Sequence, residues 1–151
     1  MAELTGELLH ILLVEDNDDH AELVIRGMRD CTVANRIHHV SDGEQALDYL
    51  FNRGAYTDIT TNPRPHLVLL DLRLPRVDGL EVLRSIKTTP SLLRIPVVIL
   101  TSSDAESDIL RAYDFHANSY VVKPLDFKTF TRLIKELGYY WLGWNVKTKT
   151  G

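Results

Sequence analysis

The 151-residue sequence has only one cysteine, Cys31, so no disulfide can form within the chain. It has no apolar run near the roughly 18–20 residues that a membrane-spanning helix needs. Its first residues lack the basic flank and apolar core of a secretion signal. It also lacks an excess of basic residues, because 17 Lys and Arg stand against 21 Asp and Glu, a net charge of −4. We therefore expect a cytoplasmic protein that binds neither nucleic acid nor membrane.

Hydrophobic residues make up 44% of the chain and charged residues 25%, a balance typical of a globular domain. Five short apolar segments alternate with segments in which apolar residues recur every three or four positions, as on one face of a helix. The predicted strands are 9–14, 37–40, 66–70, 95–100 and 119–122. Near-continuous apolar strands joined by helices predict an α/β fold with a doubly wound, five-stranded parallel sheet.

Local signals divide the chain further. We expect an N-terminal extension at residues 1–8, a single domain at 9–137, and an aromatic tail at 138–151 that is able to extend the last helix. Ser41 and Ser103 each stand three residues before a glutamate, which is the spacing of a capping box, and Asp126 is expected to cap the last helix. The proline-containing segment 52–65 is predicted to be a disordered loop, with a functional loop as the alternative.

Polar residues of particular types follow the predicted strands. Glu15 and Asp16 come after the first strand, Asp71 after the third, Thr101 after the fourth and Lys123 after the fifth. Because parallel strands end at one edge of the sheet, these side chains should converge there. Converging carboxylates need a cation, and oxygen ligands suit Mg²⁺, or Mn²⁺ in its place. A central aspartate is able to act as a nucleophile that forms an aspartyl-phosphate, and a lysine suits a phosphoryl oxygen.

Each of these residues alone also fits a helix cap or a turn, so it is the combination that carries the prediction. The combination resembles the receiver domain of two-component response regulators over residues 9–137. The likeness is carried by the segments LLVEDN, DLRLPRVDG, VVILT and YVVKP. Thr101 lies thirty residues after Asp71, and Lys123 lies fifty-two residues after it, as in that family. The resemblance implies a flavodoxin-like sheet with strand order 2-1-3-4-5.

The resemblance also implies roles for the site residues. Asp71 would be the phosphoacceptor and would help to hold Mg²⁺. Asp16 would bind the metal directly, Glu15 would act mainly through a metal-bound water, and the backbone carbonyl of Arg73 would complete the protein ligands. The side chain at the position of Arg73 would influence how fast water removes the phosphoryl group, as would that of Ser103.

The same resemblance implies a switch. Thr101 would donate its hydroxyl to the phosphoryl group, and Lys123 would pair with that group. Tyr120 would rotate inward as Thr101 moves, and the surface formed by helix four, strand five and helix five would change shape. The peptide bond before Pro124 is expected to be cis.

Expected partners follow from the family as well. A histidine kinase would donate the phosphoryl group, and a downstream phosphotransfer or effector protein would receive the signal. This chain is similar to the stand-alone regulators that partner phytochrome-type histidine kinases. The similarity lies in the segments LTSSDAESDI and AYDFHANSYVVKPLDF and in the aromatic tail. Those regulators form homodimers through the helix four–strand five–helix five face. Tyr139, Tyr140 and Trp141 would then be dimer contacts or, alternatively, would cover the core beside the last helix.

Two other functions are open on the sequence. A receiver-type fold is able to serve as a binding module without phosphorylation, although the complete acidic set argues against this. An aspartate-based phosphatase usually has an Asp-x-Asp pair after its first strand, whereas Asp71 follows the third strand and Arg73 stands where the second acid would be. We therefore expect no enzyme beyond catalysis of its own phosphorylation and dephosphorylation. The six histidines show no metal-binding spacing, so zinc is not expected.

Overall fold

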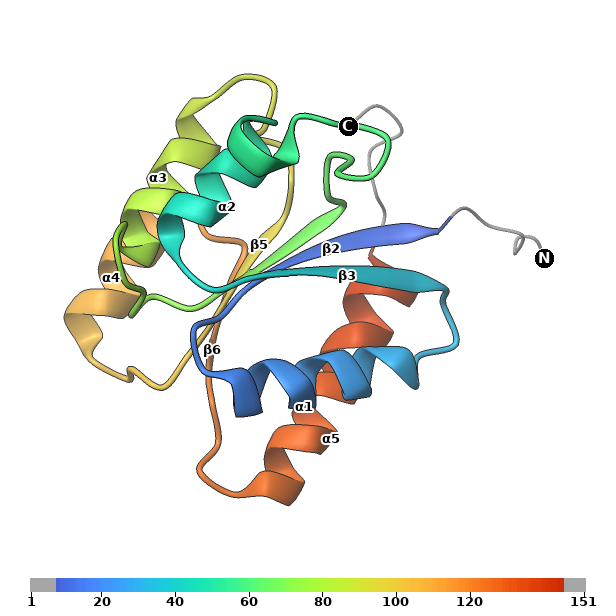
Figure 1. Ribbon diagram of the computed structural model, residues 1–151. Helices are drawn as coiled ribbons and strands as arrows, with labels where there is room; N and C mark the ends of the chain where they lie inside the picture. Colours follow the sequence, from blue (N-terminus) through green and yellow to red (C-terminus); the bar gives the residue numbers. More distant parts are fainter. Residues whose placement is uncertain (1–7, 146–151) are drawn as a thin grey trace.

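The computed structural model describes residues 8–145, so residues 1–7 of the expected extension and 146–151 of the expected tail lie outside the described part. Its centre is one parallel sheet in the order β3-β2-β4-β5-β6 (Figure 1). Because β2 is the first strand of this sheet along the chain, this is the predicted order 2-1-3-4-5, which is confirmed. The strands are β2 (Leu9–Val14), β3 (Asn35–Val40), β4 (Leu67–Leu70), β5 (Val97–Thr101) and β6 (Ser119–Val122).

Helices cover both faces of the sheet. The helix pair α1 (Asp18–Arg29) and α5 (Phe127–Gly138) lies on one face, and α2 (Gly43–Leu50), α3 (Gly79–Thr88) and α4 (Glu106–Asp114) lie on the other (Figure 1). Alternation along β2 divides the core, since Ile11 belongs to the cluster under α1 and α5 and Leu12 belongs to the opposite cluster. Within residues 8–145, no helix is long and apolar enough to cross a membrane.

The helix caps agree only in part with the predicted ones. Asp126 caps α5 as expected, since its side chain accepts from the backbone N–H of Thr129. The cap of α2 is Asp42 instead of Ser41. A D-x-x-Q pattern begins one residue after the S-x-x-E pattern, and Asp42 Oδ1 accepts from the N–H of Gln45 at 2.7 Å. The expected cap by Ser103 is also wrong: α4 begins after Ala105 without a side-chain cap.

The segment 52–65 is ordered, and the prediction of disorder is wrong. It carries a one-turn 3₁₀ helix, η1 (Gly54–Tyr56). The Asn52 side-chain amide donates to the carbonyl of Asn62 at 3.0 Å, which ties the two ends of the loop together. The Tyr49 hydroxyl, on α2, donates to the carbonyl of Pro63 at 2.9 Å. Side chains thus satisfy backbone carbonyls that have no partner in a regular helix or strand.

The aromatic segment after α5 continues as a π-helix, η2 (Tyr139–Trp144). Leu142 is buried in the core under α1 and α5, and Trp141 is packed against that core. Tyr139 is 62% exposed and Tyr140 is 51% exposed. The segment therefore has one side in the core and one side that faces solvent.

Candidate functional site

The sheet itself places the polar residues that follow its strands. The backbone N–H of Glu15 donates to Val40 at 3.0 Å, and that of Asp71 donates to Val14 at 3.1 Å. The N–H of Lys123 donates to the carbonyl of Thr101 at 2.7 Å. Each bond continues the pairing of two neighbouring strands by one residue, so the side chains are set by rigid elements. These bonds place Glu15, Asp71 and Lys123 at one edge of the sheet, as expected.

The centre of the site is a buried lysine shared by two buried carboxylates. Lys123 Nζ lies 2.7 Å from Glu15 Oε1 and 3.0 Å from Asp71 Oδ2. All three side chains have less than a tenth of their surface exposed. One positive charge therefore stands against two negative charges in a place from which water is largely excluded, and a net negative charge remains for a cation to neutralise.

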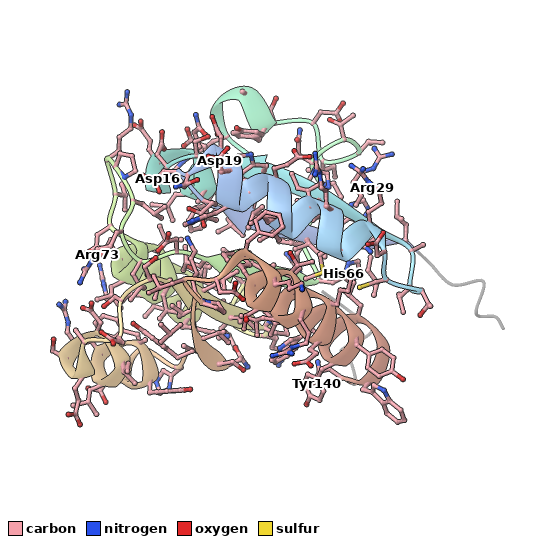
Figure 2. The ribbon with its side chains drawn as sticks, turned by 90° about the horizontal axis from the view of Figure 1, so that it is seen from below. Asp16, Asp19, Arg29, His66, Arg73 and Tyr140 are labelled. Atoms are coloured by element: carbon pink, nitrogen blue, oxygen red, sulfur yellow. The ribbon has the colours of Figure 1, made fainter. Side chains whose placement is uncertain are left out.

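Asp16 adds a third carboxylate at the solvent side. One oxygen from each of Glu15, Asp16 and Asp71 lies within 4.8 Å of the others, and Asp16 is exposed (Figure 2). The donors are all carboxylate oxygens, which fits Mg²⁺ or Mn²⁺ and not a metal that prefers sulfur or imidazole. Burial raises the pKa of the Glu15 carboxyl to about 7 although the Lys123 ammonium opposes this, and the Asp71 charge adds to the rise. A divalent cation here would favour the ionised carboxylate.

The backbone and the side chain of Arg73 have different partners. Its backbone N–H donates to Asp71 Oδ1 at 3.3 Å, which ties the loop after β4 to the carboxylate. Its guanidinium forms an ion pair with Asp108 on α4. The expected role of its carbonyl as a metal ligand stays a prediction.

Thr101 and Tyr120 meet at the same residue. Thr101 is fully buried, and its Oγ1 lies 3.4 Å from the N–H of Ser103, which donates to it. The hydroxyl of Tyr120, which is half-buried, donates to the carbonyl of Ser103 at 2.8 Å. The two expected switch residues are therefore connected through the loop between β5 and α4.

The peptide bond before Pro124 corrects one expectation. Among the described residues no peptide bond is cis, so the bond between Lys123 and Pro124 is trans. The trans form of a bond to proline is favoured by about 0.5–1 kcal/mol, and most such bonds in folded proteins are trans. Here Lys123 reaches Glu15 and Asp71 with the bond in its default form.

Two residues of the site were missed by the sequence reasoning. His20 Nδ1 lies 2.9 Å from Lys123 Nζ, and burial and this ammonium lower the pKa of His20. Asp108 is a buried acid of α4. His20 stands four residues before the buried Val24 of α1, and Asp108 stands four residues before the buried Ala112 of α4. Helical spacing could therefore have indicated both, but their partners are distant in the sequence.

Comparison with known proteins gives consistent matches. A family model for the response regulator receiver domain matches residues 11–135. The chain is 48% identical over 136 residues to the probable methanogenesis regulatory protein FilR2 of Methanothrix harundinacea, covering 89% of this chain and 84% of that protein. It is 39% identical over 132 residues to response regulator Rcp1 of Synechocystis sp., covering 87% of this chain and 88% of that protein.

Solved structures show the same likeness. The phosphorylated cyanobacterial phytochrome response regulator RcpA has a TM-score of 0.90 at 38% identity, covering 95% of this chain and all of that one. The Mn²⁺-bound form of Rcp1 has a TM-score of 0.88 at 37% identity, covering 93% of this chain and 99% of that one. The second structure holds a divalent cation of the kind that the carboxylates of this chain fit.

Proposed function

Because the chain belongs to the response regulator receiver domain family, we propose that Asp71 accepts a phosphoryl group and that this phosphorylation is the signal it carries. The observation that carries the proposal is the buried ammonium of Lys123, which lies 3.0 Å from Asp71 Oδ2 beside two further carboxylates. A carboxylate held next to a cation site and a fixed positive charge is placed to attack phosphorus, which a free surface aspartate is not.

The metal would be held by Asp16, Glu15, Asp71 and the backbone carbonyl of Arg73. When bound, Mg²⁺ or Mn²⁺ neutralises the charge that develops on phosphoryl oxygens during transfer. Glu15 and Asp71 are oriented by Lys123, so the protein groups would be in place before a donor arrives. This preorganisation is the contribution of the chain itself.

After transfer, Lys123 and the hydroxyl of Thr101 would bind phosphoryl oxygens. A phosphoryl group adds about −1.5 to −2 charges and three acceptor oxygens at pH 7. A shift of Thr101 toward those oxygens would disturb its contact with the N–H of Ser103, whose carbonyl holds the hydroxyl of Tyr120. The position of Tyr120 would thus depend on whether Asp71 is phosphorylated, and the surface of α4 and β6 would change with it.

The donor would be a histidine kinase. Its type is a finer proposal: RcpA and Rcp1 support a phytochrome-type kinase, whereas the name of FilR2 refers to the regulation of methanogenesis. A second protein, an effector or a phosphotransfer protein, would receive the signal. A cytoplasmic location belongs to the same proposal, because phosphoryl donors derived from ATP are found there.

A homodimer through the surface of α4, β6 and α5 is the second part of the proposal. Apolar side chains are exposed on this surface: Leu110 is 57% exposed, Tyr113 is 49% exposed and Val122 is 39% exposed. Contact between two copies would remove them from water, and Tyr139, Tyr140 and Trp141 are proposed as additional contacts. Phosphorylation would alter the same surface through Tyr120.

The test is intact-protein mass spectrometry after incubation with acetyl phosphate and Mg²⁺. We expect one phosphoryl addition that base removes, and no addition with Asp71→Asn. The matched control is Asp114→Asn, an exposed acid of α4, which should be phosphorylated like the wild type. Addition to Asp71→Asn at the wild-type level would contradict the assignment of the acceptor.

The two alternatives have their own outcomes. A binding module that works without phosphorylation would bind its kinase equally with and without Asp71→Asn and would show no covalent addition. A phosphatase would release phosphate from an external phosphoester over many turnovers. Phosphorylation of Asp71 without such turnover separates the proposed function from both.

A further inference from the structure

Asp108 is a buried carboxylate that the proposed phosphoryl chemistry does not use. It lies in the first turn of α4 and is 5% exposed. Its Oδ2 accepts a hydrogen bond from Ser103 Oγ at 2.6 Å and forms an ion pair with the guanidinium of Arg73. A buried carboxylate without a cation would be costly, so Arg73 is the group that makes this position tolerable.

Arg73 is also next to the proposed phosphoacceptor. It stands two residues after Asp71, and its backbone N–H donates to Asp71 Oδ1. Its side chain is 62% exposed, so the side chain is not enclosed by the fold and is able to turn toward a second partner. Figure 2 shows Arg73 at the same end of the molecule as Asp16, where the carboxylates gather. The long, flexible side chain of Arg73 therefore has one anionic partner in Asp108 and would have a second in a phosphoryl group on Asp71.

We propose that Asp108 and the phosphoryl group on Asp71 compete for the guanidinium of Arg73. The inference rests on the proposed function. A phosphoryl group carries more charge than one carboxylate and offers oxygens that a guanidinium binds in a bidentate way. When Asp71 is unmodified, Asp108 holds Arg73 against α4. When Asp71 carries the phosphoryl group, Arg73 turns toward it, and Asp108 is left with Ser103 as its partner.

The competition gives Asp108 a defined role as a positioning residue. Binding free energies are reciprocal, so a group that keeps Arg73 away from the phosphoryl group weakens binding there, and phosphorylation weakens the pair between Arg73 and Asp108 by the same factor. Release of Asp108 also changes the surroundings of Ser103, whose carbonyl accepts from Tyr120. The ion pair therefore connects occupancy at Asp71 to α4 by a second route, which meets the route through Thr101 at Ser103.

The test measures the affinity for beryllofluoride in the presence of Mg²⁺, because this anion mimics a phosphoryl group on aspartate. Four proteins are compared: the wild type, Arg73→Gln, Asp108→Asn and the double variant. Arg73→Gln keeps the backbone carbonyl proposed as a metal ligand. We expect Asp108→Asn to bind about three- to fivefold tighter and Arg73→Gln to bind weaker by a similar factor, the size of a partly exposed ion pair. In the Arg73→Gln background, Asp108→Asn should have no effect.

Asp114→Asn is the matched control, since it removes the same charge from α4 at an exposed position. Equal tightening by Asp114→Asn and Asp108→Asn, or tightening by Asp108→Asn in the absence of Arg73, would overturn the competition and indicate a general charge effect. Equal affinity of the wild type and Asp108→Asn would overturn it too. Failure of the folded wild type to bind beryllofluoride at all would instead contradict the proposed function.

A second measurement applies if Asp108→Asn does not fold. Hydrogen exchange of the α4 amides is followed in the wild type and in Arg73→Gln, with and without beryllofluoride. We expect the anion to speed exchange in the first turn of α4 in the wild type, because the pair with Asp108 is lost, and to leave that turn unchanged in Arg73→Gln. The same change in both proteins would overturn the proposal.

Discussion

The two ends of the central sheet both hold partly or fully buried ionisable groups, but they are stabilised in opposite ways. At the carboxyl ends of the strands, Lys123 compensates Glu15 and Asp71 by opposite charge. Away from that end, His10, His38 and His66 lie together, and burial lowers the pKa of His10 and of His38. Figure 2 shows the separation, with Asp16 and Arg73 at one end of the molecule and His66 toward the other. At the end with Lys123, an excess negative charge remains, to which a cation is able to respond.

The histidine cluster formed by His10, His38 and His66 is joined by direct contacts. His10 Nδ1 lies 2.9 Å from His38 Nε2, and the backbone N–H of His10 donates to His66 Nδ1 at 3.0 Å. Burial lowers the pKa of His10, and the charges of His66 and Arg36 lower it further. Burial lowers the pKa of His38 as well, with His10 and Arg36 as further causes. Burial and neighbouring positive charges thus favour the neutral imidazoles of His10 and His38.

The largest expected effect comes from removing the positive charge of the cluster formed by Lys123, Glu15 and Asp71. Lys123→Met leaves two buried carboxylates without their shared cation, and we expect a loss of about 3–5 kcal/mol in the free energy of unfolding at pH 8, measured by urea denaturation without metal. Mg²⁺ should restore part of the loss. The control is Lys135→Met, whose exposed pair with Asp30 spans 3.9 Å and should contribute less than about 1 kcal/mol. Equal losses in the two variants would remove the distinction between the buried cluster and an ordinary surface pair.

A glycine at each end gives the next contrast. A Cβ at Gly79 would lie 2.3 Å from the carbonyl oxygen of Asp71 and 2.6 Å from Leu72 Cα, and backbone cannot move aside easily. A Cβ at Gly138 would lie 2.3 Å from Cys31 Sγ, a side-chain atom that is able to rotate away. We expect Gly79→Ala to cost about 2–3 kcal/mol, and Gly138→Ala to cost at most about 1 kcal/mol because it also gains helix propensity. Urea denaturation of both variants checks the difference, and a smaller cost for Gly79→Ala would contradict it.

The cluster of Glu15, Asp71 and Lys123 was predictable because the topology of a parallel sheet determines where the residues after its strands lie. A residue after a parallel strand lies at one edge of the sheet whatever the details of packing, so Glu15, Asp71 and Lys123 could be brought together from the order of the strands. The contact between Lys123 and Glu15 spans 108 residues, yet it needed no knowledge of the side chains between them.

The other contacts depend on packing and not on topology alone. Asp108 reaches Arg73 across 35 residues, and the loop tie from Asn52 to Asn62 depends on how one side chain is directed. The histidine cluster joins three segments whose spacing resembles no metal motif. The cap at Asp42 was missed because two overlapping box patterns fit the same segment and only the geometry chooses between them. Local patterns therefore gave the elements, while long-range side-chain partners required the structure.

The pH dependence should differ in sign between the two ends. Because the folded-state pKa of His38 is lowered, its contribution is present above the unfolded value of 6.5 and is lost as pH falls through the folded pKa. Glu15 acts in the opposite direction: its pKa is raised to about 7, so its contribution is present at low pH and is lost as pH rises through that value.

His38→Gln isolates the histidine part of this dependence. We expect the free energy of unfolding to fall less between pH 7.5 and pH 5 in this variant than in the wild type, by an amount smaller than the two effects above. The measurement is urea denaturation at several pH values in metal-free buffer. His116→Gln changes an exposed histidine and should leave the wild-type slope unchanged. An unchanged slope in His38→Gln would show that the cluster is not protected from protons.

The smallest effect concerns a histidine at the charged end. His20 Nδ1 lies 2.9 Å from Lys123 Nζ, and its ring packs 5.5 Å from that of Phe130. His20→Asn keeps an oxygen acceptor near the place of Nδ1, whereas His20→Leu keeps only the apolar contact. The second variant loses one hydrogen bond, but the Lys123 ammonium keeps its two carboxylate partners. We therefore expect it to be less stable than His20→Asn by about 0.5–1 kcal/mol, the net contribution of an ordinary hydrogen bond, in urea denaturation at pH 8. Equal stability of the two variants would mean that only the carboxylates stabilise the Lys123 ammonium. The His20 ring would then contribute packing alone, unlike the hydrogen-bonded rings of His10 and His38 at the other end.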